Sequence, residues 1–308
     1  MSVVELAQVS RWYGNVVAVN DVTMRLEPGV TGLLGPNGAG KSTLISMMAG
    51  FLAPSAGTVT LDGRPLHRDP QIYREVGLVP EREEMYDSIT GGEFVLANAR
   101  LHRLRDPEAA ARQAIATVEM TEPQGRDLRT YSKGMKQRIK MATAIVHDPA
   151  VLLLDEPFNG MDPRQRLHLM ELLHRLGDEG RTILFSSHIL EEVEQIAGRI
   201  EVVVAGRHAA SGDFREIRRL MTQRPHQYTL RSSDDRALAS AVIAEPSTSG
   251  VQLVVDATGG TTVQVQATDF SAFVHALPQV AARHGIRLLE VRPADESLES
   301  VFAYLVDR

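Results

Sequence analysis

Short apolar runs recur through the first two thirds of the chain, separated by polar and turn-forming segments. The clearest runs are residues 30–34 (VTGLL), 151–154 (VLLL) and 182–186 (TILFS). A strand that is covered on both faces shows such uniform hydrophobicity instead of alternation. Residues 44–48 and 135–146, by contrast, place apolar side chains at helical spacing. The pattern predicts an α/β fold in which helices cover a buried sheet.

A different, alternating pattern precedes this core. Residues 3–10 and 15–26 alternate partially between apolar and polar positions, with a break at Tyr13-Gly14, and predict two antiparallel strands. Residues 58–61 predict another strand that ends in a turn. Residues 72–80 (IYREVGLVP) predict a buried strand that stops at Pro80. We therefore expect an antiparallel β subdomain beside the α/β core.

The pattern becomes helical from about residue 89 to residue 119, and the breakers at 121–125 end it. A further helix is predicted within residues 131–149 (YSKGMKQRIKMATAIVHDP), with Ser132 as a favourable N-cap and Asp148-Pro149 as a stop. We place a helical insertion at about residues 84–148 of the α/β domain.

The composition changes near residue 226, which predicts a first domain at 1–225 and a second at 226–308. In the second domain the predicted strands are 227–231, 252–256, 261–267 and 286–291, and the predicted helices are 236–244, 270–284 and 298–305. The order βαββαβ, followed by a last helix, is that of a small ferredoxin-like α+β domain. We find no cluster of catalytic residue types in it and expect a regulatory or dimer-stabilising module.

The composition narrows the functional classes. The 308 residues carry a formal net charge of −6, so no nucleic acid partner is expected. The absence of cysteine excludes disulfides and thiolate metal sites. No apolar run approaches the roughly 20 residues that span a bilayer, and the first residues lack the features of a signal peptide. A link to a membrane would therefore run through a partner.

Residues 35–43 (GPNGAGKST) form the strongest motif, because they follow an apolar run and precede a helical one. A glycine-rich loop at a helix N-terminus offers convergent backbone N–H groups to a polyphosphate. Lys41 would place a charge on the outer phosphates, and Ser42 a hydroxyl on Mg²⁺. The candidate phosphate-binding residues are Gly35, Pro36, Asn37, Gly38, Ala39, Gly40, Lys41, Ser42 and Thr43.

Asp155 and Glu156 directly follow the apolar run 151–154, at the end of a strand where open α/β sheets bind ligands. One carboxylate can hold Mg²⁺, usually through water, while the other polarises an attacking water. His188 follows the run 182–186 and is expected at the same edge of the sheet. A lone histidine is usually structural, but this position also suits a sensor of the γ-phosphate.

Two further features each allow two interpretations. Tyr13 could stack on a nucleobase or be an ordinary strand aromatic. Basic side chains crowd the start of the helix predicted within 131–149, where the helix dipole disfavours cations unless an anion is bound. These side chains are Lys133, Lys136, Arg138 and Lys140. They form either a solvated basic face or a second polyphosphate contact.

Taken in this order, GPNGAGKST, VLLLDEP, the following FNGMDP and SSH resemble the motifs of the ATP-binding subunits of ABC transporters. The signature of that family, most often LSGGQ, stands here as YSKGM at residues 131–135. This variant, with Glu81 where glutamine is usual, resembles a subgroup of bacterial exporters of drugs, sodium or other small solutes. The resemblance covers about residues 3–225, and the closing SLESVF is similar to the end of the C-terminal extension in that subgroup.

The resemblance implies roles for single residues. Tyr13 would stack on the base, Glu156 would be the catalytic base, and His188 would be the switch at the γ-phosphate. Glu81 would join this catalytic group. The implied Mg²⁺ ligands are Ser42, Glu81 and Asp155.

The same resemblance implies a homodimer with two ATP molecules sandwiched between the phosphate loop of one subunit and the signature of the other. The residues that would contact the ATP of the other subunit are Ser132, Lys133, Gly134 and Met135. Asp162 falls in the loop that crosses the dimer interface. Closure on ATP and reopening after hydrolysis would move the helices of a membrane partner.

We therefore expect an ATPase that uses ATP and Mg²⁺ to energise solute export through a separate integral membrane permease, on the cytoplasmic face of the cell membrane. A permease helix would dock at Met85, Tyr86 and Phe94, unless these side chains pack the core of the insertion. The alternative is a soluble DNA-handling or regulatory ABC ATPase. DNA-handling members carry long coiled coils or zinc modules, whereas this chain has no cysteine and no sustained heptads.

Overall fold

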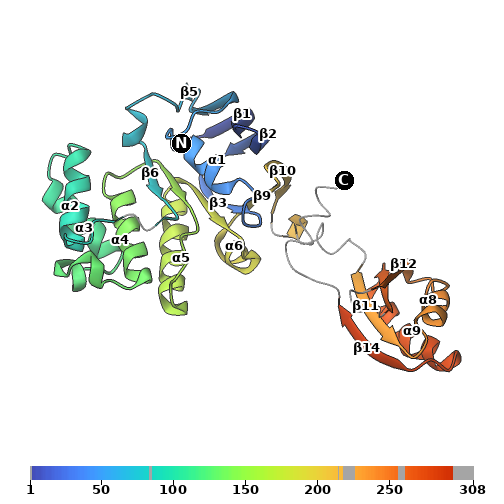
Figure 1. Cartoon of the computed structure of the whole chain (residues 1–308). Helices are drawn as coiled ribbons and strands as arrows, with labels where there is room; N and C mark the ends of the chain where they lie inside the picture. Colours follow the sequence, from blue (N-terminus) through green and yellow to red (C-terminus); the bar gives the residue numbers. More distant parts are fainter. Residues whose placement is uncertain (1, 83–84, 214, 218–225, 256–260, 294–308) are drawn as a thin grey trace. The chain divides into compact units, whose positions relative to one another are not determined.

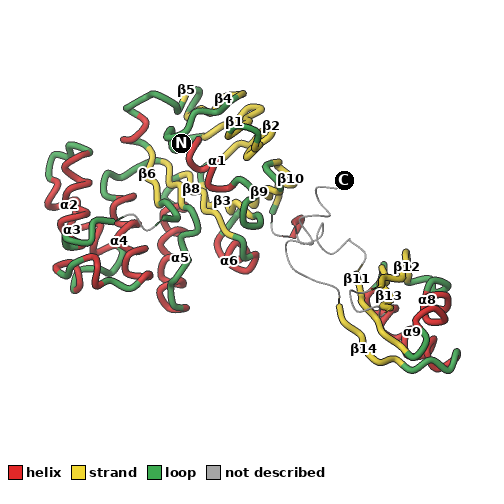
Figure 2. The backbone as a smooth tube through the Cα atoms, viewed as in Figure 1, coloured by secondary structure: helices red, strands yellow, loops and turns green. Residues whose placement is uncertain are grey.

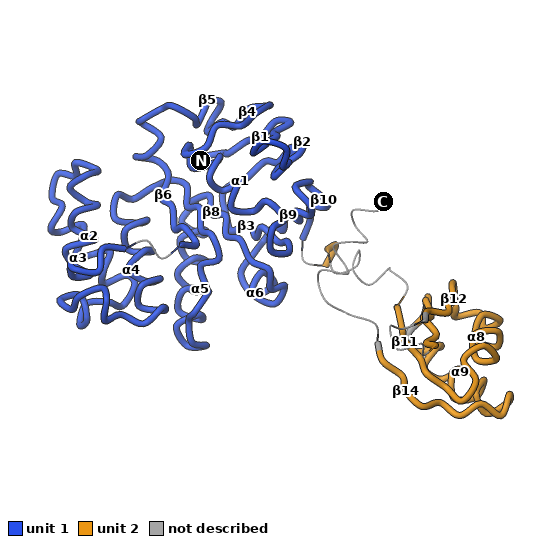
Figure 3. Tube along the Cα trace, in the orientation of Figure 1, with its two compact units in different colours: residues 1–214 blue, residues 215–308 orange. Residues whose placement is uncertain are grey.

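The computed structural model describes the chain except for residues 1, 83–84, 214, 218–225, 256–260 and 294–308 (Figure 1). The chain divides into two compact units, Met1–Phe214 and Arg215–Arg308 (Figure 3). The boundary expected at residue 225 falls at the end of a stretch that lies outside the described residues. Each unit encloses a hydrophobic core of its own.

A six-stranded sheet forms the centre of the first unit, in the order β10-β9-β3-β8-β7-β6 (Figure 2). Its strands are β3 (Gly29–Leu34), β6 (Val76–Val79), β7 (Val151–Leu154), β8 (Thr182–Ser187), β9 (Arg199–Val204) and β10 (Arg207–Gly212). All neighbouring strands are parallel except β9 and β10. The helices that follow β3, β7 and β8 are α1 (Lys41–Met48), α5 (Pro163–Asp178) and α6 (Leu190–Ile196). Every residue of β7 is buried, which confirms the prediction from its uniformly apolar sequence.

A four-stranded antiparallel sheet, in the order β2-β1-β4-β5, belongs to the same unit. Its strands are β1 (Val4–Tyr13), β2 (Val16–Leu26), β4 (Ala56–Leu61) and β5 (Arg64–Pro65). Apolar side chains of β1, β2, α1 and β7 share one buried cluster. The antiparallel β subdomain predicted from the alternating pattern is therefore confirmed, and its core is continuous with that of the central sheet.

The helical insertion contains α2 (Gly91–Leu101), α3 (Pro107–Thr117) and α4 (Lys133–Ile145), with two 3₁₀ turns, η2 (Pro123–Gly125) and η3 (Leu128–Thr130), before α4. The helical stretch predicted at 89–119 is divided before Pro107. Asp106 starts α3 by accepting a hydrogen bond from the Ala109 amide at 2.9 Å, and Pro107 fits the first turn because no partner for an N–H is needed there. Among the described residues, no helix is long and apolar enough to cross a membrane.

The strand predicted at residues 72–80 is wrong in its first half. Residues Ile72–Arg74 form a 3₁₀ helix, η1, and β6 begins only at Val76. The carboxylate of Asp69 accepts a hydrogen bond from the Gln71 amide at 2.9 Å, a local contact that competes with an extended backbone. At Gly77 a Cβ atom would lie 2.2 Å from the Ala144 carbonyl oxygen. Glycine therefore allows β6 to approach α4.

The second unit is a four-stranded antiparallel sheet in the order β12-β13-β11-β14. Its elements are β11 (His226–Ser232), α8 (Asp235–Val242), β12 (Thr248–Val255), β13 (Thr261–Ala267), α9 (Phe270–Arg283) and β14 (Leu288–Pro293). Side chains of α8 and α9 pack with alternate residues of β11 and β13 in one core. The predicted ferredoxin-like order βαββαβ is confirmed, whereas the helix predicted at 298–305 lies outside the described residues.

Two stacked histidines join the insertion to the central sheet. The ring of His102, at the end of α2, stacks on the ring of His147, after α4. The two ring centres lie 3.8 Å apart, and the ring planes are nearly parallel, with an interplanar angle of 5°. The Nε2 atom of His147 lies 3.3 Å from the Val76 carbonyl oxygen of β6. Burial lowers the pKa of His147 to about 4, and the neighbouring His102 acts in the same direction. The folded state therefore favours the neutral form of this side chain.

This pKa predicts an acid-dependent contribution to stability. Because the unfolded pKa of histidine is near 6.5, the unfolded chain binds a proton at His147 as the pH falls below that value, whereas the folded chain does not. The free energy of unfolding should therefore decrease between about pH 6.5 and pH 4, by less than about 1.4 kcal/mol per pH unit, since one proton is involved. His147→Phe should remove this part of the slope in urea denaturation at several pH values. The exposed His174 supplies the control, and an equal loss of slope in His174→Phe would contradict the assignment.

Candidate functional site

The loop between β3 and α1 has a backbone that glycine alone allows at two positions. A Cβ atom at Gly35 would lie 2.2 Å from the Val203 carbonyl oxygen. Gly40, with φ of 101°, is the N-cap of α1, and a Cβ there would lie 2.5 Å from the Ala18 carbonyl oxygen. No side chain caps the N-terminus of α1, so its first amides are available to a ligand.

This loop lines a cavity of about 300 Å³. The residues around the cavity are Ala18, Asn37, Gly38, Ala39, Gly40, Lys41, Ser42, Thr43, Glu81 and Glu156. Most of the predicted phosphate-binding residues thus meet Glu81, after β6, and Glu156, after β7. They meet because the carboxyl ends of parallel strands lie at one edge of the sheet.

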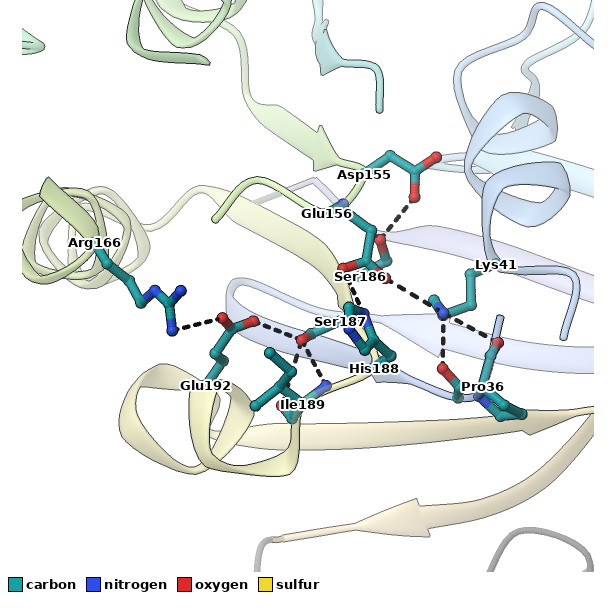
Figure 4. Close-up of polar contacts among 11 residues, drawn as sticks. Pro36, Lys41, Asp155, Glu156, Arg166, Ser186, Ser187, His188, Ile189 and Glu192 are labelled. Carbon is teal, nitrogen blue, oxygen red and sulfur yellow. Dashed lines mark hydrogen bonds and ion pairs between the residues drawn. The ribbon is translucent and has the colours of Figure 1, made fainter. Parts of the chain in front are cut away.

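Lys41 is held inside the site by its own loop (Figure 4). Its Nζ atom donates hydrogen bonds to the carbonyl oxygens of Gly35 (2.7 Å) and Pro36 (3.2 Å) and lies 3.4 Å from Oε1 of Glu156. The side chains of Lys41 and Glu156 are only 6% and 7% exposed. A buried ammonium group thus faces a buried carboxylate across the cavity, and both charges are partly compensated by this pairing.

The two carboxylates that follow β7 differ in their surroundings. Oδ1 of Asp155 accepts a hydrogen bond from the hydroxyl of Ser186 at 2.7 Å, and that hydroxyl accepts one from the Glu156 amide at 2.8 Å. Oε2 of Glu156 lies 3.0 Å from Nδ1 of His188, whereas Oε1 has no hydrogen-bond partner within the described part of the chain. Burial raises the pKa of Glu156, while Lys41 and His188 act in the opposite direction. Glu156 therefore carries a buried acceptor oxygen that faces only the ammonium of Lys41 among the described residues.

The donor set at this edge fits Mg²⁺. Glu81 and Ser42 line the cavity, whereas Asp155 does not line it but follows β7 at the same edge of the sheet. The three offer carboxylate and hydroxyl oxygens, which are the ligands that this hard cation prefers. Among the described residues, no group of three or more histidine or acidic side chains is close enough to hold a metal alone. This arrangement suits Mg²⁺, which is usually bound by one or two carboxylates together with phosphate oxygens and water.

The signature segment lies elsewhere in the first unit. Ser132 caps α4 by accepting a hydrogen bond from the Met135 amide at 3.2 Å, and Asp162 caps α5 by accepting one from the Gln165 amide at 2.9 Å. Gly134 is buried, while Ser132, Lys133 and Asp162 are exposed. None of these residues lines the phosphate cavity of the same chain.

Tyr13 stands at the end of β1 and is 47% exposed. The guanidinium of Arg11 lies 4.8 Å from the centre of its ring, which is cation–π distance. Arg11 also donates a hydrogen bond to the Ala53 carbonyl oxygen at 3.1 Å. The aromatic ring is therefore supported by Arg11 and remains partly open to a stacking partner.

Lys140 does not belong to the basic cluster predicted at the start of α4. Its side chain is buried, and Nζ donates to the carbonyl oxygens of Pro80 (2.6 Å), Glu81 (3.4 Å) and Arg82 (3.4 Å). The ammonium group thus holds the backbone that carries Glu81. Lys140 is therefore neither part of a solvated basic face nor a phosphate contact. The sequence could have indicated its burial, because Ala144, one helical turn later, lies on the buried face of α4.

The phosphate loop, the carboxylates of Asp155 and Glu156, and His188 all follow parallel strands of one sheet. This combination defines the class of nucleotide-hydrolysing P-loop domains. A family model described as ABC transporter matches residues 19–159. The bacitracin transport ATP-binding protein BcrA of Enterococcus faecalis is 32% identical over 99% of this chain and 96% of its own length. The linearmycin resistance ATP-binding protein LnrL of Bacillus subtilis is 30% identical over 97% of each chain. The chain belongs to the ABC transporter ATP-binding proteins, as the motifs predict, and is an ATPase of that family.

A solved structure described as the ATP-binding subunit of an ABC transporter supports the same assignment. It is 29% identical, and the similarity covers 70% of this chain and 92% of that chain with a TM-score of 0.65. The predicted fold class, an ABC-type P-loop ATPase core, is confirmed. The two bacterial relatives also extend over nearly the whole chain, so the similarity to them includes most of the second unit.

The three carbonyl contacts of Lys140 lead to a prediction. Lys140→Met should loosen the segment from Pro80 to Arg82, because its partly buried carbonyl oxygens lose a charged donor, an interaction of about 1.5–3 kcal/mol. We expect trypsin to cleave the native protein faster after the exposed Arg82. Mass spectrometry of the digestion products measures this cleavage. Lys133→Met, which removes an exposed cation from the same helix, should leave this cleavage unchanged. Equal cleavage in wild type and Lys140→Met would show that Lys140 does not hold the segment.

Proposed function

We propose that this protein is the ATPase subunit of an exporter and acts on a separate membrane permease from the cytoplasmic side. The similarity to the bacitracin transport and linearmycin resistance proteins over nearly the whole chain carries this proposal. It favours transport over DNA handling, because one relative is named for bacitracin transport and the other for linearmycin resistance. The solute would be a small molecule, moved without touching this subunit.

The chemistry follows from the cavity. The amides of residues 38–43 and the ammonium of Lys41 bind the ATP phosphates, which displace Lys41 from its contact with Glu156. Ser42, Asp155 and Glu81 would hold Mg²⁺, which would neutralise charge on the phosphates when bound. Glu156, released from Lys41, accepts a hydrogen bond from the attacking water and acts as the general base. His188 holds Oε2 of Glu156 and contacts the γ-phosphate.

The second half of the site comes from a second copy of the chain. Ser132, Lys133, Gly134 and Met135 lie at the start of α4, where the helix dipole and the cation of Lys133 favour an anion. Because they do not line the cavity of their own chain, they bind the ATP of the other subunit, with Asp162 at the interface. Tyr13 stacks on the base. The second unit stabilises or regulates this dimer.

Two variants separate phosphate binding from hydrolysis. Lys41→Ala should abolish ATP binding, because the cavity loses its cation. Glu156→Gln should bind ATP but lose roughly 10²–10⁴-fold in turnover, the usual contribution of a general base. With Mg-ATP, Glu156→Gln should therefore accumulate as a dimer in size-exclusion chromatography with light scattering. A Glu156→Gln protein that remains monomeric under saturating Mg-ATP would contradict the sandwich dimer.

The permease is proposed to dock beside the loop that carries Glu81. Tyr86 is 73% exposed, while Met85 and Phe94 are half-buried. Tyr86 therefore offers an exposed aromatic ring in the described part of the segment between β6 and α2. A permease helix that binds Tyr86 would contact the chain five residues after Glu81.

Tyr86→Asp tests this docking surface. Since an exposed residue contributes little to the core, the fold and the basal ATPase activity should not change, while permease-stimulated ATPase activity and transport should be lost. An interface anchor is typically worth more than about 1 kcal/mol. The control is Leu101→Asp, because Leu101, the last residue of α2, is exposed to a similar degree. This variant should retain stimulation. Stimulation that survives in Tyr86→Asp would place the dock elsewhere.

A further inference from the structure

A buried carboxylate on α6 links two parts of the first unit that are far apart in the sequence. Glu192 is only 7% exposed, and its two oxygens have different partners. Oε1 lies 3.2 Å from NH1 of Arg166 on α5, and Oε2 accepts a hydrogen bond from the hydroxyl of Ser187 at 2.6 Å (Figure 4). None of these three residues lines the phosphate cavity.

One end of this contact controls the backbone at His188. Ser187 is fully buried at the end of β8, and its hydroxyl oxygen also accepts a hydrogen bond from the Ile189 amide at 2.9 Å. His188 stands between these two residues, so the hydroxyl fixes the turn from which the imidazole projects. That imidazole lies 3.0 Å from Oε2 of Glu156. A shift of Ser187 would therefore move the contact between His188 and Glu156.

The other end lies beside the signature segment. Arg166 is in the first turn of α5, next to Gln165, whose Oε1 occupies the space where a Cβ atom of Gly134 would be, 2.1 Å away. The same turn is capped by Asp162. Neighbouring residues of α5 thus contact the signature helix on one side and Glu192 on the other.

The geometry of the ion pair is not that of a contact built for maximal stability. Only one nitrogen of Arg166 reaches Glu192, and its Nε atom is buried without a hydrogen-bond partner in the described part of the chain. A paired fork of two hydrogen bonds would be the stronger arrangement, and buried ion pairs are in general weak evidence for stability. The single contact does, however, set the position of the carboxylate that holds Ser187.

We propose that Arg166 and Glu192 are positioning residues for ATP hydrolysis. Through Ser187 they set the orientation of His188, and through His188 that of Glu156, so that the first turn of α5 beside the signature segment is connected to the hydrolytic carboxylate. The inference rests on the roles proposed above for His188 and Glu156. It adds that a correct turn at His188 requires the Arg166–Glu192 contact.

The test compares turnover with ATP affinity in the full-length protein. Arg166→Met and the isosteric Glu192→Gln should each lower kcat for Mg-ATP about 10- to 100-fold, the range expected when a catalytic group is misplaced by about 1 Å. KM and the melting temperature should stay near the wild-type values. Glu192→Gln leaves no unpaired buried carboxylate, so it stays informative if Arg166→Met folds poorly. Arg166→Lys should restore part of the turnover.

Two controls remove equivalent charges from the same helices. Glu191→Gln changes the exposed neighbour of Glu192, and Arg175→Met removes an exposed guanidinium from α5. Neither should change kcat, because neither side chain contacts Ser187 or the phosphate cavity in the described structure. A loss of turnover in these controls equal to that in Arg166→Met and Glu192→Gln would point to a general charge effect and overturn the proposal.

Combination with His188→Ala decides whether the effect passes through the histidine. Residues that act through one group give non-additive effects, so Arg166→Met should cause no further loss of kcat in His188→Ala. Two outcomes would overturn the positioning role of Arg166 and Glu192 alone. In the first, the losses of kcat in the double variant multiply. In the second, Arg166→Met and Glu192→Gln have normal turnover while His188→Ala is impaired. Normal turnover in His188→Ala would reject both the role of His188 and the positioning role of Arg166 and Glu192.

Discussion

The contact between the ammonium of Lys41 and the carboxylate of Glu156 is the interaction on which the site depends. Both groups are almost completely buried and lie 3.4 Å apart, so each charge offsets part of the cost of burying the other. They arise from loops more than a hundred residues apart in sequence. The parallel pairing of β3, β8 and β7 brings them to one edge. A polyanion that binds Lys41 therefore also removes the positive charge beside Glu156.

The parts of the site that sequence predicts are those whose determinants are local. The phosphate loop needs only glycines between a strand and a helix, and Asp155 and Glu156 need only the end of an apolar strand. The contacts that sequence misses join distant residues. Lys140 reaches carbonyl groups some sixty residues earlier, and Glu192 pairs with Arg166 on another helix. Their residue types alone indicate solvated charges, because burial by a distant segment leaves no local pattern.

The elements themselves show the same division. The second unit is predicted in its order because alternating strands and an amphipathic helix leave clear periodicities, and its buried residues, such as Val263 and Val265, alternate with the exposed Gln264 and Gln266. The strand predicted at residue 72 is wrong because a single carboxylate, that of Asp69, stabilises a turn. The hydrophobicity of residues 72–80 does not distinguish a strand from a 3₁₀ turn, since an apolar residue such as Ile72 is buried in the turn as well.

The backbone at Glu156 has a consequence for how far this fold can be stabilised. With φ of 48°, this residue occupies the left-handed region, which disfavours side chains other than glycine or asparagine by about 1–2 kcal/mol. A glycine there would relax the turn after β7 and would remove a buried charge, yet it would also remove the carboxylate that faces the cavity. Selection for thermal robustness and selection for turnover therefore oppose each other at this position.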